Sequence, residues 1–319
     1  MSGQSTPLRE TLNHSVQGVN KRRNQDWCSV EGAGTAEDPL ILVVADGHGS
    51  AVHARSEIGA RYAVDLFAVQ AREFASLVRT EGPEGTPSLS WLMNYARNEL
   101  PRRLIAGWQE EVLRHWSRHP AESMSTGGTE PRDDQKLLLY GATLIGAVMT
   151  PHLFVAWQLG DGELTVVEED GKVSLPLAPA EADLGDETES LCSRHAWRLV
   201  RMHWAPIVTQ DRAPRMIALS TDGLSKSFAS DEGFTQFMTG LDQRLSEDGL
   251  ESVRAALPEW LGKAARYSGD DTTLVAARRP TDAATDDSST EHNITELCGT
   301  EPGVTDHGTI GRTSTTAHG

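Results

Sequence analysis

The chain has 319 residues and a formal net charge of −17 at pH 7, and its length allows one large domain or two ordinary ones. The acidity disfavours nucleic acid or an anionic membrane as the main partner, because both carry negative charge. The three cysteines, Cys28, Cys192 and Cys298, form no Cys-x-x-Cys pair, which argues against a disulfide framework or a thiolate zinc site and fits a reducing cytosol. No apolar run reaches 18 residues and the N-terminus has no apolar signal core, so we expect a soluble, cytoplasmic protein.

The spacing of apolar residues predicts a mixed α/β order of elements. Alternating or continuous apolar runs indicate strands, which cover Thr11–Gly18, Asp26–Gly32, Leu40–Ala45, Leu137–Thr150, Leu153–Leu159, Glu163–Glu168, Trp197–Trp204, Arg215–Ser220 and Thr272–Arg278. Helical spacing indicates amphipathic helices over Ala54–Arg79, Leu89–Trp116, Glu232–Leu245 and Gly249–Ala265. Pro101 is expected to kink or split the second of these helices.

The two ends of the chain differ in composition from the rest. Residues 1–7 are expected to form a flexible N-terminus. Residues 280–319 contain no aromatic residue, and seven acidic residues stand there against one arginine. Such a segment cannot bury enough surface to offset its ordering entropy, so we predict a disordered acidic tail. Residues 8–279 are then the folded unit, with loops expected at residues 81–88, 119–135 and 175–186.

Several of the predicted strands end in an aspartate. The strand Leu40–Ala45 runs into Asp46-Gly47-His48-Gly49, later strands run into Asp161 and Asp222, and Asp270-Asp271 precedes the last strand. Strand ends that share a sheet edge would bring these acids together, and crowded carboxylates are usually compensated by a divalent cation. Two cations about 3.5–4 Å apart can activate a bridging water and clamp a phosphoryl oxygen. Asp-Gly is also a tight-turn signal, and for Asp161, in Gly-Asp-Gly-Glu, a hairpin turn is favoured.

The motifs together resemble the metal-dependent serine/threonine protein phosphatases of the 2C type, the PPM family. Four stretches match the family's order and approximate spacing over about residues 14–278. They are Gly18 with Asn24-Gln25-Asp26, Val44–Gly49, Gly141–Leu144 with Leu159–Gly162, and Leu219–Leu224 with Asp270–Val275.

The resemblance implies a four-layer α/β fold over residues 8–279, a 2C-like catalytic domain in which two antiparallel sheets are flanked by helices. The metals would lie in a cleft at one edge of the sheet pair. The implied reaction is hydrolysis of phosphoserine or phosphothreonine in proteins by a water that bridges two Mn²⁺ or Mg²⁺ ions, without a covalent phospho-enzyme.

The resemblance also implies roles for individual residues. Asp46 would bridge both metals, the Gly47 carbonyl would bind one of them, and Asp222 and Asp270 would be the other direct ligands. Asp26 would bind the second metal or hold its waters. His48 would be the general acid that protonates the leaving oxygen, a task that suits an imidazole with an unperturbed pKa of about 6.5. The alternative for His48 is a structural histidine that caps the turn.

Three positions depart from the family's pattern. Lys21, followed by Arg22 and Arg23, stands where the family has an arginine that grips the substrate phosphate, and a lysine lacks the bidentate fork. One of the neighbouring arginines could substitute, while the alternative for the whole basic run is a solvated turn. Gln25 replaces a frequent glutamate and is a poorer ligand for a hard cation. Lys226 stands where relatives often carry an aspartate for a third metal, and it argues against a third metal here.

Two rival functions stay open, and the departures support the first of them. The first is a phosphatase-fold signalling or scaffold protein that binds phosphoprotein or metal with little or no turnover. The second is a phosphatase of small molecules, because substrate choice depends on surface loops. The main interpretation predicts a phosphoprotein substrate, a cognate serine/threonine kinase acting in the same signal transduction, no nucleic acid or membrane partner, and a monomer.

Overall fold

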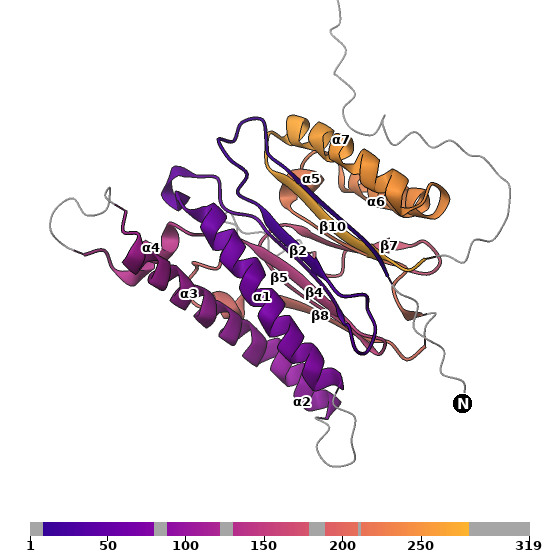
Figure 1. The fold of residues 1–319 in the computed structure, drawn as a ribbon, viewed down its shortest axis with the longest axis horizontal. Helices are drawn as coiled ribbons and strands as arrows, with labels where there is room; N and C mark the ends of the chain where they lie inside the picture. The colour runs from indigo at the N-terminus through magenta and orange to yellow at the C-terminus, as the bar shows by residue number, and fades with distance from the viewer. Residues whose placement is uncertain (1–8, 80–87, 122–129, 179–188, 210–211, 281–319) are drawn as a thin grey trace, which may run out of the picture.

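The computed structural model describes residues 9–79, 88–121, 130–178, 189–209 and 212–280. The expected flexible N-terminus, the expected acidic tail and parts of the three expected loops lie outside these residues. Within the described residues, two antiparallel five-stranded sheets face each other (Figure 1). One sheet has the strand order β1-β10-β9-β6-β7 and the other has the order β2-β3-β4-β5-β8.

Within the described residues, the strands follow the predicted order along the chain, except that the short β7 was not predicted. Their bounds are β1 Glu10–Val16, β2 Trp27–Glu31, β3 Leu40–Ala45, β4 Leu144–Met149, β5 Leu153–Leu159, β6 Glu163–Val167, β7 Val173–Ser174, β8 Arg201–Pro206, β9 Met216–Ser220 and β10 Thr272–Arg278. All six residues of β3 are buried, because both faces of its sheet are covered, and this explains its continuous apolar run.

The helices form the two outer layers. They are α1 Ser56–Arg79, α2 Leu89–Asn94, α3 Leu100–Arg118, α4 Asp133–Leu138, α5 Asp222–Ser225, α6 Asp231–Glu247 and α7 Leu250–Ser268. A π-helical segment, Tyr95–Glu99, joins α2 to α3 and keeps a helical backbone throughout. The helical run therefore changes pitch directly before Pro101 and is not split. Pro101 itself is the second residue of α3, and because α3 continues this helical run, the missing N–H of the proline removes one hydrogen bond from it.

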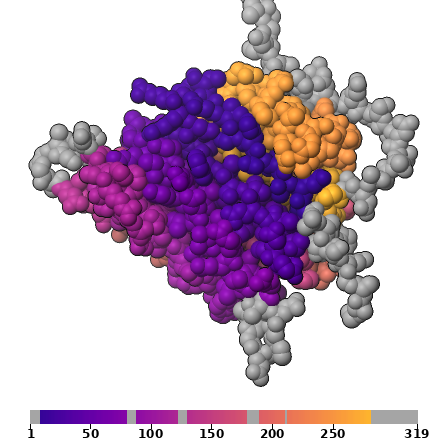
Figure 2. Space-filling view, in the orientation of Figure 1, coloured from indigo at the N-terminus to yellow at the C-terminus, as the bar shows by residue number. Residues whose placement is uncertain are grey.

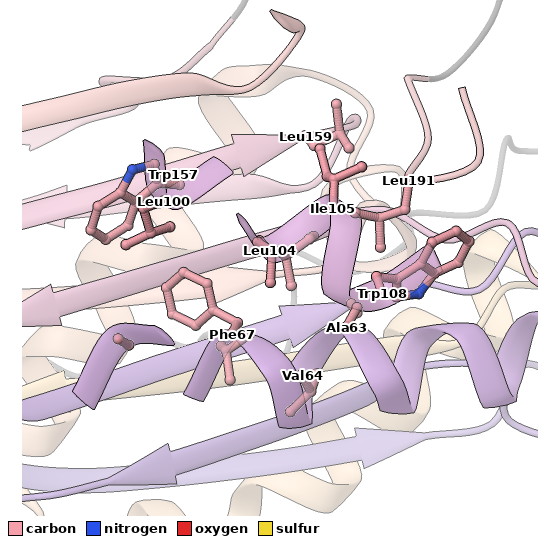
Figure 3. Packing of buried hydrophobic residues seen from close by; sticks show 14 of the residues in the cluster. Ala63, Val64, Phe67, Leu100, Leu104, Ile105, Trp108, Trp157, Leu159 and Leu191 are labelled. Atoms are coloured by element: carbon pink, nitrogen blue, oxygen red, sulfur yellow. The ribbon is translucent and has the colours of Figure 1, made fainter. Parts of the chain in front are cut away.

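Three apolar clusters hold the four layers together. The first packs α1 and α3 against the outer face of β3, β4 and β5, with Phe67, Leu104, Trp108 and Trp157 at its centre (Figure 3). The second lies between the two sheets, and the third packs α6 and α7 against β1, β9 and β10. In the space-filling view the N-terminal strands border the region of α6 and α7 (Figure 2), where β1 contacts α7. The predicted four-layer fold is confirmed.

Two predicted strands have different bounds for local reasons. Leu137 and Leu138 were assigned to a strand, but they end α4, which starts with a capping arrangement between Arg132 and Gln135. Trp197 was also assigned to a strand, but it lies in a short 3₁₀ turn, and β8 begins only at Arg201. In both cases a short helical segment takes up residues that the apolar pattern assigned to a strand.

Candidate active site

Strand pairing brings the predicted acids to one end of the sandwich. In one sheet β9 and β10 are antiparallel neighbours, so Asp222, after β9, lies near Asp270, before β10. In the other sheet Trp27 at the start of β2 pairs with Ala45 at the end of β3, which brings Asp26 beside Asp46. The four carboxylates therefore come from four strand ends, two in each sheet.

Asp26 joins the two sheets at this end. Its Oδ2 accepts hydrogen bonds from the hydroxyl of Thr221 at 2.9 Å and from that of Thr273 at 2.7 Å. Its Oδ1 is buried and has no hydrogen-bond partner among the described residues. One oxygen is thus tied into the fold, and the other remains available to a ligand.

The loop after β3 is fixed by backbone contacts on both sides. Thr143 N donates to the carbonyl of Asp46 at 2.8 Å, and Gly47 N donates to the carbonyl of Gln25 at 3.1 Å. A Cβ at Gly47 would lie 2.7 Å from that same Gln25 oxygen, so this close approach requires glycine. The strand end therefore presents the Asp46 carboxylate and the Gly47 backbone in a fixed geometry.

Asp222 and Asp270 each contact a lysine. Lys226 Nζ pairs with Asp222 Oδ2 and lies 3.5 Å from Asp161 Oδ2. Lys21 Nζ lies 2.5 Å from Asp270 Oδ1. Asp222 Oδ1 is buried and, within the described part of the chain, accepts no hydrogen bond. The hairpin turn favoured for Asp161 is wrong, because β5 and β6 on either side of it belong to different sheets. Asp161 lies in the connection between the sheets and faces the same cluster through Lys226.

Asp271 has a different function from its neighbour Asp270, and the sequence did not separate the two. Its Oδ1 accepts from Gly18 N and its Oδ2 from Gln25 N, both at 2.8 Å. Both carboxylate oxygens thus bind the segment that carries Lys21 and Asp26. Asp271 is a structural anchor for the site, and nothing in the sequence pattern predicted these two backbone donors.

The three basic residues Lys21–Arg23 also differ from one another in what they contact. Only Lys21 contacts the carboxylate cluster. Arg23 donates to the carbonyl of Ala54 at 2.6 Å and pairs with Glu57 at 2.7 Å, and Arg22 is exposed and has no hydrogen bond or ion pair among the described residues. Gln25 also points elsewhere, because its amide donates to the His48 carbonyl at 3.2 Å and to the Ser56 hydroxyl.

His48 follows Asp46 and Gly47 in the loop after β3, and the charges of Asp161 and Lys21 act on its ring. Its backbone N donates to the carbonyl of Gly141 at 3.1 Å, and its ring contacts that of His53, with 4.7 Å between centroids. Burial, with His53 and Lys21 adding to it, lowers the pKa of His48 to about 4, and Asp161 opposes this shift. The imidazole is therefore neutral at pH 7 and lies within reach of the charges of the site.

The pKa values of three of the clustered aspartates are raised, as expected for buried carboxyl groups that lie close together. Burial raises the pKa of Asp26 to about 7, and the charges of Asp271 and Asp222 add to the shift. Burial, followed by the charges of Asp26 and Asp222, raises the pKa of Asp46 well above its usual value, and the pKa of Asp222 is raised by burial and by Asp161. Three carboxyl groups held together in this way favour a neutralising cation.

The donor set fits a hard divalent cation. All candidate ligands are oxygens, the type that Mg²⁺ and Mn²⁺ prefer, and Asp26 and Asp222 each have one buried oxygen with no described hydrogen-bond partner. Within the described residues, no group of three or more histidine, cysteine, aspartate or glutamate side chains is already arranged to hold a metal ion. The fit therefore rests on the donor chemistry and the unsatisfied oxygens.

A family model for protein phosphatase 2C matches residues 17–262. The chain therefore belongs to the protein phosphatase 2C family, and it is a metal-dependent serine/threonine protein phosphatase, a hydrolase of phosphoserine and phosphothreonine. The match ends before Asp270. Membership does not favour the binding-only rival. No curated protein sequence is significantly similar to this chain.

Several bacterial phosphatases have solved structures that are similar to this chain. A bacterial serine phosphatase is 14% identical with a TM-score of 0.53, and 86% of this chain and 100% of that chain are covered. A serine/threonine phosphatase from Staphylococcus aureus is 14% identical, with a TM-score of 0.52 and coverage of 87% and 99%. The catalytic domain of the phosphatase PstP, in complex with two manganese ions, is 17% identical, with a TM-score of 0.51 and coverage of 86% and 100%.

No helix among the described residues has the length and apolar character needed to cross a membrane.

Proposed function

We propose that this phosphatase works with two divalent cations, Mn²⁺ or Mg²⁺, held at the end of the sheet sandwich. Asp46, the carbonyl of Gly47, Asp222 and Asp270 would be the direct ligands. Asp26 would contribute its free Oδ1 or hold a water of the second ion. The observation that carries this proposal is the crowding of buried aspartates whose pKa values are raised and whose oxygens are in part unsatisfied.

Bound there, the cations would lower the pKa of a water and neutralise charge on the phosphoryl group. The protein's own part is to keep the ligands in place. Thr221 and Thr273 orient Asp26, and Asp271 fixes the segment from Gly18 to Gln25. Hydrogen bonds that hold the metal ligands in place commonly decide how well a metal site functions.

We assign the substrate phosphate to Lys21. Its ammonium lies beside Asp270 and close to Gly49, where a Cβ would come within 2.7 Å of Nζ. A lysine binds phosphate as a point charge, without the bidentate geometry of arginine. Arg22 is exposed and could add long-range attraction, whereas Arg23 is occupied by Glu57 and the Ala54 carbonyl.

His48 would donate the proton to the serine or threonine oxygen as the phosphorus–oxygen bond breaks. Without substrate its pKa is lowered to about 4, which keeps it neutral at pH 7. A phosphate dianion beside the ring would favour the charged form and shift the pKa back towards its usual range. The proposal therefore requires that substrate binding itself prepares the acid.

The biological setting follows the family. On the basis of family membership and of the net charge of −17, we propose a phosphoprotein substrate and a partner serine/threonine kinase. We also propose a role in signal transduction, a cytoplasmic location and a monomeric state.

The test is metal-dependent hydrolysis of p-nitrophenyl phosphate and of a phosphothreonine peptide, with Mn²⁺, Mg²⁺ or EDTA. Asp46→Ala and Asp222→Ala are expected to lower turnover at least about a thousandfold, because each would remove a metal ligand. Asp65→Ala, which removes an exposed aspartate on α1 paired with Arg61, is the matched control and should retain full activity.

Two outcomes would contradict the proposal. Turnover that persists in EDTA would exclude the metal mechanism. A folded protein that binds Mn²⁺ but hydrolyses neither substrate would support the scaffold alternative instead.

A further inference from the structure

The ring of His48 is supported by a second histidine that the proposed mechanism does not use. His53 ends the short turn Ala51–His53, directly before α1. The two imidazoles are tilted by 51°, with 4.7 Å between their centroids. Nδ1 of His53 is hydrogen-bonded to the backbone carbonyl of Leu138. A carbonyl only accepts, so Nδ1 of His53 carries the proton, and this bond fixes the orientation of its ring.

Both rings lie on the backbone of Gly141. A Cβ there would lie 2.6 Å from His53 Nδ1 and 2.8 Å from His48 Cδ2, so no larger residue fits beneath them. This segment is itself anchored, because Arg55 N donates to the carbonyl of Leu139 at 2.8 Å. The two histidines therefore share a fixed backbone platform.

The contact with His53 matters because little else orients the His48 side chain. Among the described residues, no hydrogen bond reaches either ring nitrogen of His48. Its main chain is tied to Gly141, but rotation of the ring is limited by packing against His53 and Gly141. A general acid must lie within hydrogen-bond distance of the atom that it protonates, and small misplacements are costly.

We propose that His53 is a positioning residue that holds the imidazole of His48 towards the leaving oxygen of the substrate. This rests on the proposed role of His48 as general acid. In the step concerned, a water adds its oxygen to phosphorus and releases one proton to solvent. The phosphorus–oxygen bond to the serine or threonine breaks, and its electron pair stays on the serine or threonine oxygen. That oxygen takes the proton from His48, and a neutral imidazole and a free hydroxyl group remain.

This role predicts an effect that depends on the leaving group. An alkoxide from threonine is a poor leaving group and needs the proton, whereas p-nitrophenolate is stable without it. Misplacing His48 should therefore impair hydrolysis of a phosphothreonine peptide far more than hydrolysis of p-nitrophenyl phosphate. A merely structural role of His53 would lower both rates alike.

The experiment compares four variants on both substrates with saturating Mn²⁺. His53→Ala removes the supporting ring, and His53→Phe keeps a ring against His48 but loses the bond to Leu138. His48→Ala sets the scale for complete loss of the acid. His115→Ala is the matched control, because it removes another half-buried histidine, one bonded to the Tyr140 hydroxyl, that does not touch His48. Thermal unfolding and Mn²⁺ affinity show that each variant is folded and keeps its metal site.

We expect His53→Ala to lower kcat about tenfold on the phosphopeptide and less than about threefold on p-nitrophenyl phosphate, with His53→Phe in between. If His48→Ala shows this selectivity and His53→Ala behaves like His115→Ala, the positioning role is refuted while the general acid stands. If His48→Ala itself has no selectivity, the general-acid role fails, and the inference about His53 fails with it.

Discussion

Asp242 and Asp222 are both buried aspartates with basic partners, but they differ in how many of their carboxylate oxygens are paired. Asp242 on α6 has 1% of its surface exposed, and both of its oxygens are paired, one with Arg278 Nε at 2.9 Å and the other with Arg215. Asp222 at the start of α5 is 6% exposed and pairs one oxygen with Lys226, whose side chain is 58% exposed. Its other oxygen accepts no hydrogen bond among the described residues.

The difference separates an ion pair that holds the fold from one that is prepared for a ligand. A buried carboxylate whose two oxygens are each paired with a guanidinium group has neither oxygen available to bind a metal ion. A buried carboxylate with a free oxygen, beside further carboxylates, costs stability unless a cation completes it. Proteins keep such incomplete groups mainly where they function.

The largest expected effect concerns Asp242 and its two partners, Arg278 and Arg215, which form the completed cluster. Asp242→Ala leaves the guanidinium groups of Arg278 and Arg215 at a buried site without their carboxylate. Breaking a buried pair in this way typically costs about 3–5 kcal/mol, and we expect a loss of that size in the free energy of unfolding. Urea unfolding in EDTA measures it.

The matched variant at the incomplete cluster is Asp222→Asn. It removes one of several repelling charges and one lysine pair, so we expect a change within about 1 kcal/mol in EDTA. Turnover with Mn²⁺ should nevertheless be nearly abolished. If Asp222→Asn destabilised the fold as much as Asp242→Ala, the distinction between the two clusters would be wrong.

A smaller effect is expected at Lys226, the cation nearest to Asp222. Lys226→Met removes an ammonium that would repel an incoming metal ion, so we expect Mn²⁺ to bind roughly three- to tenfold more tightly. Isothermal titration calorimetry measures both affinity and stoichiometry.

Lys263→Met is the control, because Lys263 pairs with Glu259 on α7 with the same four-residue spacing but lies outside the acid cluster. Equal Mn²⁺ affinity in the two variants would show that Lys226 has no electrostatic influence on the metal. An additional bound ion in Lys226→Met would show that this lysine had been excluding a third metal.

The sequence predicted the sheets and the acids at strand ends because both depend on local patterns, apolar runs and the residue that stops them. It could not separate Asp270 from Asp271, because the role of Asp271 depends on where the backbone N–H groups of Gly18 and Gln25 lie in space. It could not choose among Lys21, Arg22 and Arg23 either, since the conformation of the segment decides which of them reaches the acids. The catalytic and metal-binding roles of these residues remain predictions.

Glu163, at the start of β6, gives an effect that depends on pH. Burial raises its pKa to about 7, and the charges of Asp231, Asp161 and Asp222 add to the shift. In the unfolded chain the pKa is about 4.3, so the folded state holds this proton more tightly. The resulting contribution to stability is present below about pH 4.5 and is lost as the pH rises towards and through 7.

Glu163→Gln removes this titration and keeps an acceptor for the Ser225 hydroxyl. We therefore expect the variant to equal the wild type near pH 4.5 and to exceed it by roughly 1–2 kcal/mol at pH 8, measured by urea unfolding in EDTA. Glu259→Gln is the control of opposite sign, because hydrogen bonding to Lys263 lowers the pKa of Glu259, and this variant should gain nothing at pH 8. A difference between Glu163→Gln and wild type that does not change with pH would mean that Glu163 is not part of the incomplete, charge-crowded cluster.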